Sequence, residues 1–181
     1  MNDTIKTLFE NAKSKDKQVS YEAYQSILKE TEQEVDWAYE VWDQLIADLA
    51  DKDNHQRSRA AQYLAHLAKS DPENRMLMAF PNLWNVTKDE KFVTARHSLQ
   101  SIWKVALAGQ EQKEIVIQHF AYRFQNCEDE KNYTLIRSDI IQNFRNLYDQ
   151  LKDEELKVQA LSLIDFVEDR KYQKKYLNIW K

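Results

Sequence analysis

One apolar pattern decides the fold class of this chain: residues 35–49 read VDWAYEVWDQLIADL, and their apolar side chains return every three or four residues. Val35, Ala38, Trp42, Leu45 and Leu49 would therefore lie along one face of a helix, which completes a turn in 3.6 residues. A β-strand would alternate apolar and polar residues with a period of two. The stretch predicts an amphipathic helix with one buried face.

The same spacing returns along the rest of the chain. Further stripes are formed by Ala60, Leu64, Leu67 and Ala68; by Leu99, Ile102, Trp103 and Ala106; by Tyr133, Ile136, Ile140, Phe144 and Leu147; and by Leu156, Ala160, Leu163 and Val167. Residues typical of helix ends divide the chain between these stripes. They predict ten helices, at residues 2–13, 17–30, 33–51, 54–69, 71–86, 88–107, 110–129, 130–149, 152–169 and 170–181. Since the 181 residues include one glycine and two prolines, few residues suit the tight turns of β-hairpins. We expect an all-α fold in a single domain spanning residues 1–181.

Polar residues support the proposed helix starts. Three pairs of a hydroxyl residue and a glutamate three positions later match the capping box: Thr31 with Glu34, Ser70 with Glu73, and Thr87 with Glu90. Four aspartates mark further starts: Asp16, Asp53, Asp129 and Asp153.

A repeat is visible in the second helix of each predicted pair. Connections of two or three residues make consecutive helices antiparallel neighbours, so ten helices form about five pairs. Basic residues recur at equivalent second-helix positions, at intervals of 37, 41 and 37 residues: Arg59, Arg96, Arg137 and Lys174. Such a period is typical of a helical solenoid.

The third pair resembles a repeat of the HEAT/armadillo class. Residues 80–83, Phe-Pro-Asn-Leu, lie inside its first helix, Asp89 lies at the turn, and Val93 and Arg96 open its second helix. This order is similar to the HEAT pattern of a proline-kinked helix followed by an aspartate, a valine and an arginine. The other first helices lack the proline.

The resemblance implies a right-handed α-α solenoid whose second helices line a concave face. It also implies that Arg96 and Arg137 are structural arginines that join neighbouring repeats.

The sequence supports no enzymatic reaction, no metal site and no cofactor. The four histidines lack the spacing of metal-ligating pairs. His119 and Cys127 share one stripe, but eight residues span ~12 Å along a helix, which exceeds hydrogen-bond reach. The single cysteine cannot form an intrachain disulfide, which favours a cytoplasmic location. The longest apolar run, Met76 to Phe80, is too short to span a membrane, so we expect no membrane association.

Charge is divided unequally between the helices. The second helices of the pairs carry a net charge of +10, the first helices −13 and the connections −1, which together give the overall charge of −4. Basic residues opposite the core stripes of the second helices form a candidate binding strip on the concave face: His55, Arg59, His66, Lys69, His97, Lys104, Lys131, Arg145, Arg170, Lys171 and Lys174. In the alternative interpretation, these residues only complement acidic neighbours or helix C-terminal dipoles.

The leading hypothesis is a non-catalytic protein-interaction scaffold with an immunity-like, adaptor or regulatory role. Its basic concave surface would attract an acidic protein partner. The alternative is a nucleic-acid-binding protein resembling the HEAT-like DNA alkylation-repair glycosylases, which hold duplex DNA in a basic groove. A pI near 5.6 and two second helices without net charge favour the protein partner.

Overall fold

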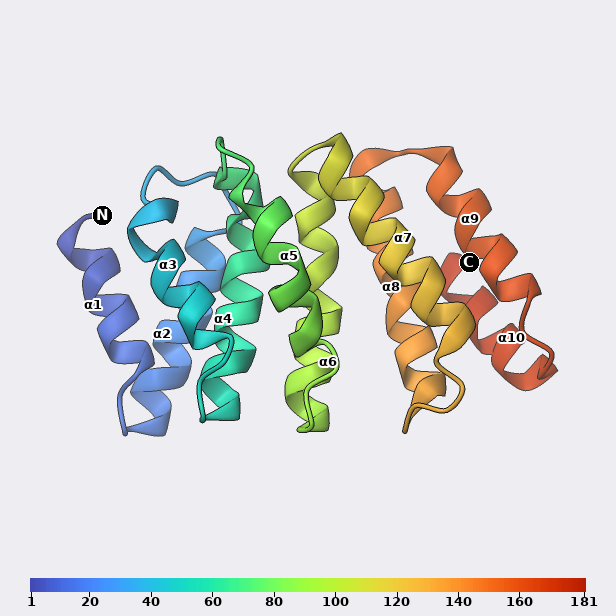
Figure 1. Ribbon diagram of the computed structural model, residues 1–181, viewed down its shortest axis with the longest axis horizontal. Coiled ribbons are helices and arrows are strands. Elements are labelled where there is room, and N and C mark those ends of the chain that lie inside the picture. The colour runs from blue at the N-terminus through green and yellow to red at the C-terminus, as the bar shows by residue number, and fades with distance from the viewer. The chain divides into compact units, whose positions relative to one another are not determined.

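The computed structural model describes residues 1–181 as ten α-helices without a β-strand (Figure 1). The α-helices are α1 (Asp3–Ala12), α2 (Lys17–Glu30), α3 (Ala38–Asp48), α4 (Asn54–Leu67), α5 (Arg75–Val86), α6 (Phe92–Ser101), α7 (Gln110–Asn126), α8 (Tyr133–Leu151), α9 (Glu154–Asp165) and α10 (Arg170–Leu177). Three 3-10 helices follow α4, α6 and α10: η1 (Ala68–Ser70), η2 (Ile102–Leu107) and η3 (Asn178–Trp180). The all-α prediction is confirmed. No helix combines the length and the apolar composition that crossing a membrane requires.

The chain forms two compact units. Unit 1, Met1–Ser101, contains α1 to α6, and unit 2, Ile102–Lys181, contains η2, α7 to α10 and η3. Each unit has its own buried apolar centre. A single domain over residues 1–181 stays a prediction.

In unit 1, helix α4 is the central element. It contacts α2, α3, α5 and α6, and nine of its residues are buried (Figure 1). Its small residues Ala60, Ala61 and Ala65 allow neighbouring backbones to approach closely, while Leu64 and Leu67 fill the core. A helix surrounded in this way has little surface left for solvent.

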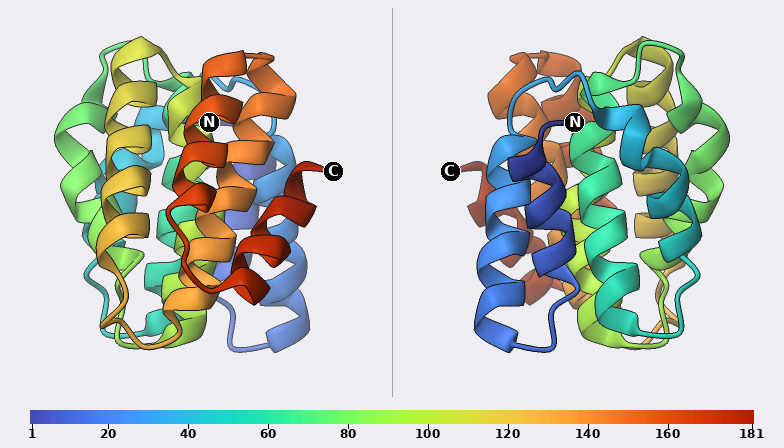
Figure 2. Two further views of the ribbon diagram at one scale, coloured as in Figure 1. Left: turned by 90° about the vertical axis from the view of Figure 1, so that its right-hand side faces the viewer. Right: turned by 90° about the vertical axis from the view of Figure 1, so that its left-hand side faces the viewer.

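In unit 2, helix α8 has the corresponding central place. It contacts η2, α7, α9, α10 and η3, and α10 lies along it (Figure 2, left). Its stripe residues Ile140 and Phe144 are fully buried, and the Phe144 ring centroid lies 5.9 Å from that of Phe120 on α7. The predicted core stripes are confirmed in both units, apart from Val35, Trp103 and Tyr133, which are only partly buried.

The three predicted capping boxes are wrong. Thr31 Oγ1 donates to the carbonyl of Ile27 (2.8 Å) and Thr87 Oγ1 donates to the carbonyl of Trp84 (2.6 Å). Each threonine thus ends the preceding helix. The hydroxyl of Ser70 accepts a hydrogen bond from a backbone N–H of the α2–α3 connection. A hydroxyl in a short connection can serve the last carbonyls of one helix as well as the first N–H groups of the next.

The four aspartates predict helix starts more reliably than the three capping boxes do. Asp16, Asp53 and Asp153 are N-caps whose carboxylates accept hydrogen bonds from backbone N–H groups of α2, α4 and α9. Asp129 does not start a helix, because α8 begins after Asn132, which has a φ of 63°. A carboxylate cannot donate to the carbonyls of a preceding helix, so its position is the clearer signal.

Candidate functional site

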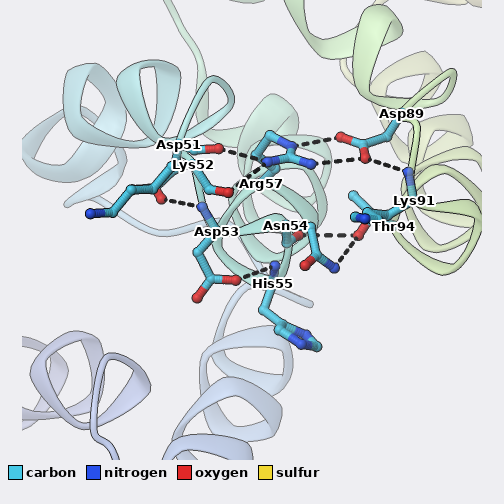
Figure 3. Close-up of polar contacts among 9 residues, drawn as sticks. All are labelled: Asp51, Lys52, Asp53, Asn54, His55, Arg57, Asp89, Lys91 and Thr94. Carbon is cyan, nitrogen blue, oxygen red and sulfur yellow. Dashed lines mark hydrogen bonds and ion pairs between the residues drawn. The ribbon is translucent and has the colours of Figure 1, made fainter.

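A polar network joins the start of α4 to the connection between α5 and α6 (Figure 3). Arg57 Nε donates to Asp89 Oδ2 (2.6 Å), and Arg57 Nη2 donates to Asp89 Oδ1 (3.0 Å). Arg57 Nη1 also donates to the carbonyl of Asp51 (2.8 Å), and Asp89 Oδ1 accepts from the backbone N–H of Lys91 (2.9 Å). Two fixed backbone groups and a bidentate ion pair thus hold this corner of unit 1.

The ion pair is largely removed from water, since the Arg57 and Asp89 side chains are 14% and 7% exposed. Burial by itself would raise the pKa of Asp89, but the hydrogen bonds from Arg57 and from the Lys91 N–H outweigh it and hold the pKa below its ordinary value. Beside the pair, Asn54 Nδ2 donates to Thr94 Oγ1 (3.1 Å), which joins α4 directly to α6 (Figure 3). The network has a structural role.

Arg59, a member of the predicted binding strip, is used inside unit 1. Its Nη1 donates to the carbonyl of Ala12 and to Ser20 Oγ, both at 2.6 Å. Its guanidinium carbon lies 5.2 Å from the centre of the Tyr24 ring. These contacts hold α4 against α2 and the end of α1. The Arg59 guanidinium, which was expected to face a partner, therefore has partners within unit 1.

His66 and Lys69 depart from the predicted strip in the same way. His66 is buried, with its Nδ1 3.2 Å from Thr31 Oγ1, so the prediction that it faces an open groove is wrong. Lys69 is partly buried and donates to the carbonyl of Glu32. The physical reason is the central place of α4, because α2 and α6 cover the flanks that a helical wheel leaves free.

Two histidines of the predicted strip do reach solvent in unit 1. His55 lies on the first turn of α4 with its ring pointing away from the Arg57 network (Figure 3), and His97 lies on α6. The predicted structural Arg96 beside it is partly buried.

In unit 2, three members of the predicted strip are spread over different elements. Lys104 is partly buried, with its Nζ 4.9 Å from the centre of the Trp103 ring. Arg145 Nε donates to both carboxylate oxygens of Asp149 at 3.0 Å, so its charge is already paired. Lys131 is exposed in the α7–α8 connection.

Four exposed cations lie close together in the sequence on α10. Arg170, Lys171, Lys174 and Lys175 are all exposed, none forms an ion pair, and the eight residues of α10 include no acidic residue. We call these four residues the α10 basic surface. Sequence analysis missed Lys175, although it lies four positions after Lys171 and therefore on the same face. Arg170 and Lys174 form the neighbouring row.

The opposite side of α10 is fixed to the unit. Tyr176 is fully buried, and its hydroxyl donates to the carbonyl of Thr134 on α8 (2.9 Å). The Asp169 carboxylate caps the helix by accepting from the backbone N–H of Lys171 (2.8 Å). Gln173 Nε2 contacts the carbonyl of Ile164 on α9 at 3.5 Å. The cations therefore stand on a helix whose orientation is set by its buried side.

Buried arginines stabilise the α7–α8 corner. Arg137, predicted to be structural, donates from Nε to the carbonyl of Phe124 (2.8 Å) and from Nη2 to Glu128 (3.1 Å). Arg123 was missed by sequence analysis, and its Nη2 donates to Glu130 Oε2 (2.8 Å). Arg137 thus joins α8 to α7 and to the connection between these helices, and Arg123 joins α7 to the same connection.

One further pair of titratable groups lies in a surface pocket of unit 2. A surface pocket of about 280 Å³ between α7 and α9 surrounds Lys113 and Asp153, whose Nζ and Oδ2 are 2.6 Å apart. The hydrogen bond from Lys113 lowers the pKa of Asp153, which favours the ionised form of this carboxylate. No group of three or more His, Cys, Asp or Glu residues could hold a metal ion.

The single thiol is also unsuited to nucleophilic chemistry. Cys127 is fully buried, and its burial raises the pKa of the thiol. A nucleophilic cysteine needs a low pKa and access to solvent. Cys127 thus contributes to the core of unit 2.

No protein-family model matches this sequence, and no curated protein matches it.

Proposed function

We propose that the protein is a HEAT-like, right-handed α-α solenoid of antiparallel helix pairs that acts as a non-catalytic interaction scaffold. In this proposal, an acidic protein partner binds the α10 basic surface. Cytoplasmic location remains part of the proposal and rests on the single cysteine of the sequence.

A repeated capping contact supports the solenoid. Asp16, Asp53, Asp89 and Asp169 each accept a hydrogen bond from the backbone N–H two residues later, at the start of α2, α4, α6 and α10. The first three are spaced by 37 and 36 residues. In unit 1, Arg57 further joins the second helix of one pair to the aspartate of the next. A unit repeated at this spacing is the signature of a solenoid.

The α10 basic surface is the single observation that carries the function. The arginines at positions 57, 59, 123 and 137 have internal hydrogen-bond partners, whereas the four cations of α10 form no ion pair, and only Lys171 has a ring contact, with Tyr172. Like charges on neighbouring turns repel each other, so their accumulation costs stability unless a partner neutralises them. A rigid helix presenting four such charges would steer an acidic surface toward it and speed its association.

The size of this surface favours a protein over a nucleic acid. An eight-residue helix is ~12 Å long. The burial of His66 and the internal contacts of Arg59 leave no continuous basic strip on α4. Duplex DNA needs many phosphate contacts to bind tightly at physiological salt, and a protein of net charge −4 opposes such binding at long range.

Fluorescence anisotropy with two labelled probes tests the proposal: a 16-residue peptide rich in Glu and Asp, and a 16-base-pair DNA duplex. The variant Lys171→Glu/Lys174→Glu should weaken peptide binding by at least ~10-fold. The control Lys15→Glu/Lys17→Glu changes the net charge equally at exposed, unpaired lysines of unit 1 and should have a much smaller effect.

Two outcomes would contradict the proposal. Equal losses in both double variants would show that only overall charge matters. Sub-micromolar duplex binding that is lost in the α10 variant would establish the nucleic-acid function instead.

A further inference from the structure

Phe166 is an exposed aromatic side chain immediately before the α10 basic surface. It follows the last residue of α9, is 56% exposed, and forms no ring contact with another aromatic residue. Three residues separate it from Arg170, the first residue of α10. Exposing a phenylalanine leaves a large apolar area in water, which a partner side chain could cover.

Two cations of α10, Arg170 and Lys174, lie on the part of the helix surface that adjoins the Gln173 contact with α9, whereas Lys171 and Lys175 lie on the far side. Gln173 reaches the carbonyl of Ile164, two residues before Phe166. Arg170 lies one helical turn before Gln173 and therefore on the same side of α10. The chain between Phe166 and Arg170 also limits their Cα separation to about 14 Å. A single short peptide can therefore reach both the ring and Arg170, and Lys174 lies one turn farther along the same row of α10.

The charge of the surface changes from acidic near Phe166 to basic along α10. Asp165 and Glu168 are exposed and lie within two residues of Phe166 in the sequence, whereas the cations begin at Arg170 and continue along α10. A bound carboxylate would be repelled next to Phe166 and attracted farther along the helix. The surface thus has an apolar end without positive charge and a basic end.

We propose, on the basis of the function proposed above, that the partner is an acidic segment with an aliphatic or aromatic side chain at one end. That side chain packs on Phe166, and the carboxylates that follow it pair with the α10 basic surface. The apolar contact excludes water and slows dissociation, while the charges speed the encounter. Recognition therefore requires both features in the right order.

Val158 provides a matched control for this inference. It is also exposed on α9, at 64%, but Glu154 and Glu155 lie one turn before it. An acidic segment should avoid that site. Replacing either Val158 or Phe166 by serine removes exposed apolar area without removing a buried side chain, so both variants should retain the fold, which circular dichroism can verify.

Three fluorescein-labelled 14-residue peptides test the proposal by anisotropy. The first has two leucines at one end followed by Glu and Asp, the second has serines in place of the leucines, and the third keeps the leucines but has Gln in place of the acids. The first peptide is made in two versions, one with the leucines at the N-terminus and one with the leucines at the C-terminus. The wild-type protein should bind the better of these two at least ~10-fold more tightly than the serine peptide. Phe166→Ser should abolish that preference, and Val158→Ser should retain it.

The outcomes separate this inference from the proposed function. If both acidic peptides bind equally well to the wild type, or if Phe166→Ser keeps the leucine preference, the apolar anchor is overturned and the basic surface stands. If neither acidic peptide binds more tightly than the glutamine peptide, the proposed function itself fails, and the anchor fails with it. Tight binding of a competing DNA duplex at the same surface would also overturn both.

Discussion

At the scale of single residues, Ile140 and His97 should differ strongly in their contribution to stability. Ile140 is fully buried at the centre of unit 2, so Ile140→Ala should lower the free energy of unfolding by ~2 to 5 kcal/mol through lost apolar burial and a residual cavity. His97 is exposed, and His97→Ala should cost less than ~0.5 kcal/mol. Urea denaturation measures both changes. Equal costs would contradict the placement of these side chains.

The Arg57–Asp89 pair should contribute more than an ordinary surface ion pair. Removing one partner leaves the other charge largely buried, so Arg57→Ala should destabilise the protein by about 3 kcal/mol. The Arg75–Glu73 pair is a suitable control, because its side chains are 40% and 61% exposed. Arg75→Ala should change the unfolding free energy by less than ~1 kcal/mol in the same denaturation experiment.

The same pair predicts a pH dependence. The pKa of Asp89 is lower in the folded protein than its ordinary value of 3.8. The stability due to its ionised form is therefore complete well above pH 4 and is lost as the pH falls through the folded pKa. The difference in unfolding free energy between the wild type and Asp89→Asn should shrink between pH 5 and pH 2, measured by urea denaturation at each pH. A difference that stays constant would show that the charge of Asp89 does not stabilise the fold.

At the scale of helices, the number of neighbours decides what a helix can present to solvent. Helix α4 is surrounded by α2, α3, α5 and α6, and its Arg57, Arg59 and His66 make internal contacts. Helix α10 is packed on α8 and α9 and keeps an open side with four cations. The two helices differ in how many neighbouring helices cover them within their units.

Helix starts give a second test at this scale. Asp53 accepts a hydrogen bond from the backbone N–H of His55 (2.8 Å) and caps α4, so Asp53→Ala should cost ~1 kcal/mol. Asp129 is exposed and caps no helix, so Asp129→Ala should have almost no effect. Thermal unfolding followed by circular dichroism can compare the two variants. A cost at Asp129 matching that at Asp53 would restore the helix start that the sequence pattern suggested there.

For the whole molecule, the net charge of −4 predicts weak binding of nucleic acids. At ~150 mM salt, the Kd for a DNA duplex should be no tighter than the ~10⁻⁴ to 10⁻⁶ M of non-specific association. Any binding through the four cations of α10 should fall with salt at a log–log slope of roughly −4, because each neutralised phosphate releases counterions. Anisotropy titrations at several salt concentrations measure this slope. A tight complex with a much steeper slope would point to a larger basic surface.

The sequence by itself determined the helical fold class, the order of the ten helices and most of their buried stripes. These features depend on interactions within a few residues: the 3.6-residue period, the scarcity of glycine and the aspartate caps at Asp16, Asp53 and Asp153. It also predicted that Arg170, Lys171 and Lys174 are exposed, because a short helix rich in lysine keeps an exposed side in most packings.

Only the tertiary structure decided which other basic residues remain exposed. A helical wheel shows the direction of His66 and Arg59 relative to one core stripe, but their burial depends on α2 and α6, which are distant in the sequence. The pairing of Arg57 with Asp89 is likewise a contact over 32 residues. The sequence also did not determine whether the Thr31 hydroxyl would bond to the end of the preceding helix, as it does, or to the start of the next. Local periodicity specifies the face of a helix, whereas the exposure of its flanks is a property of the neighbours packed against it.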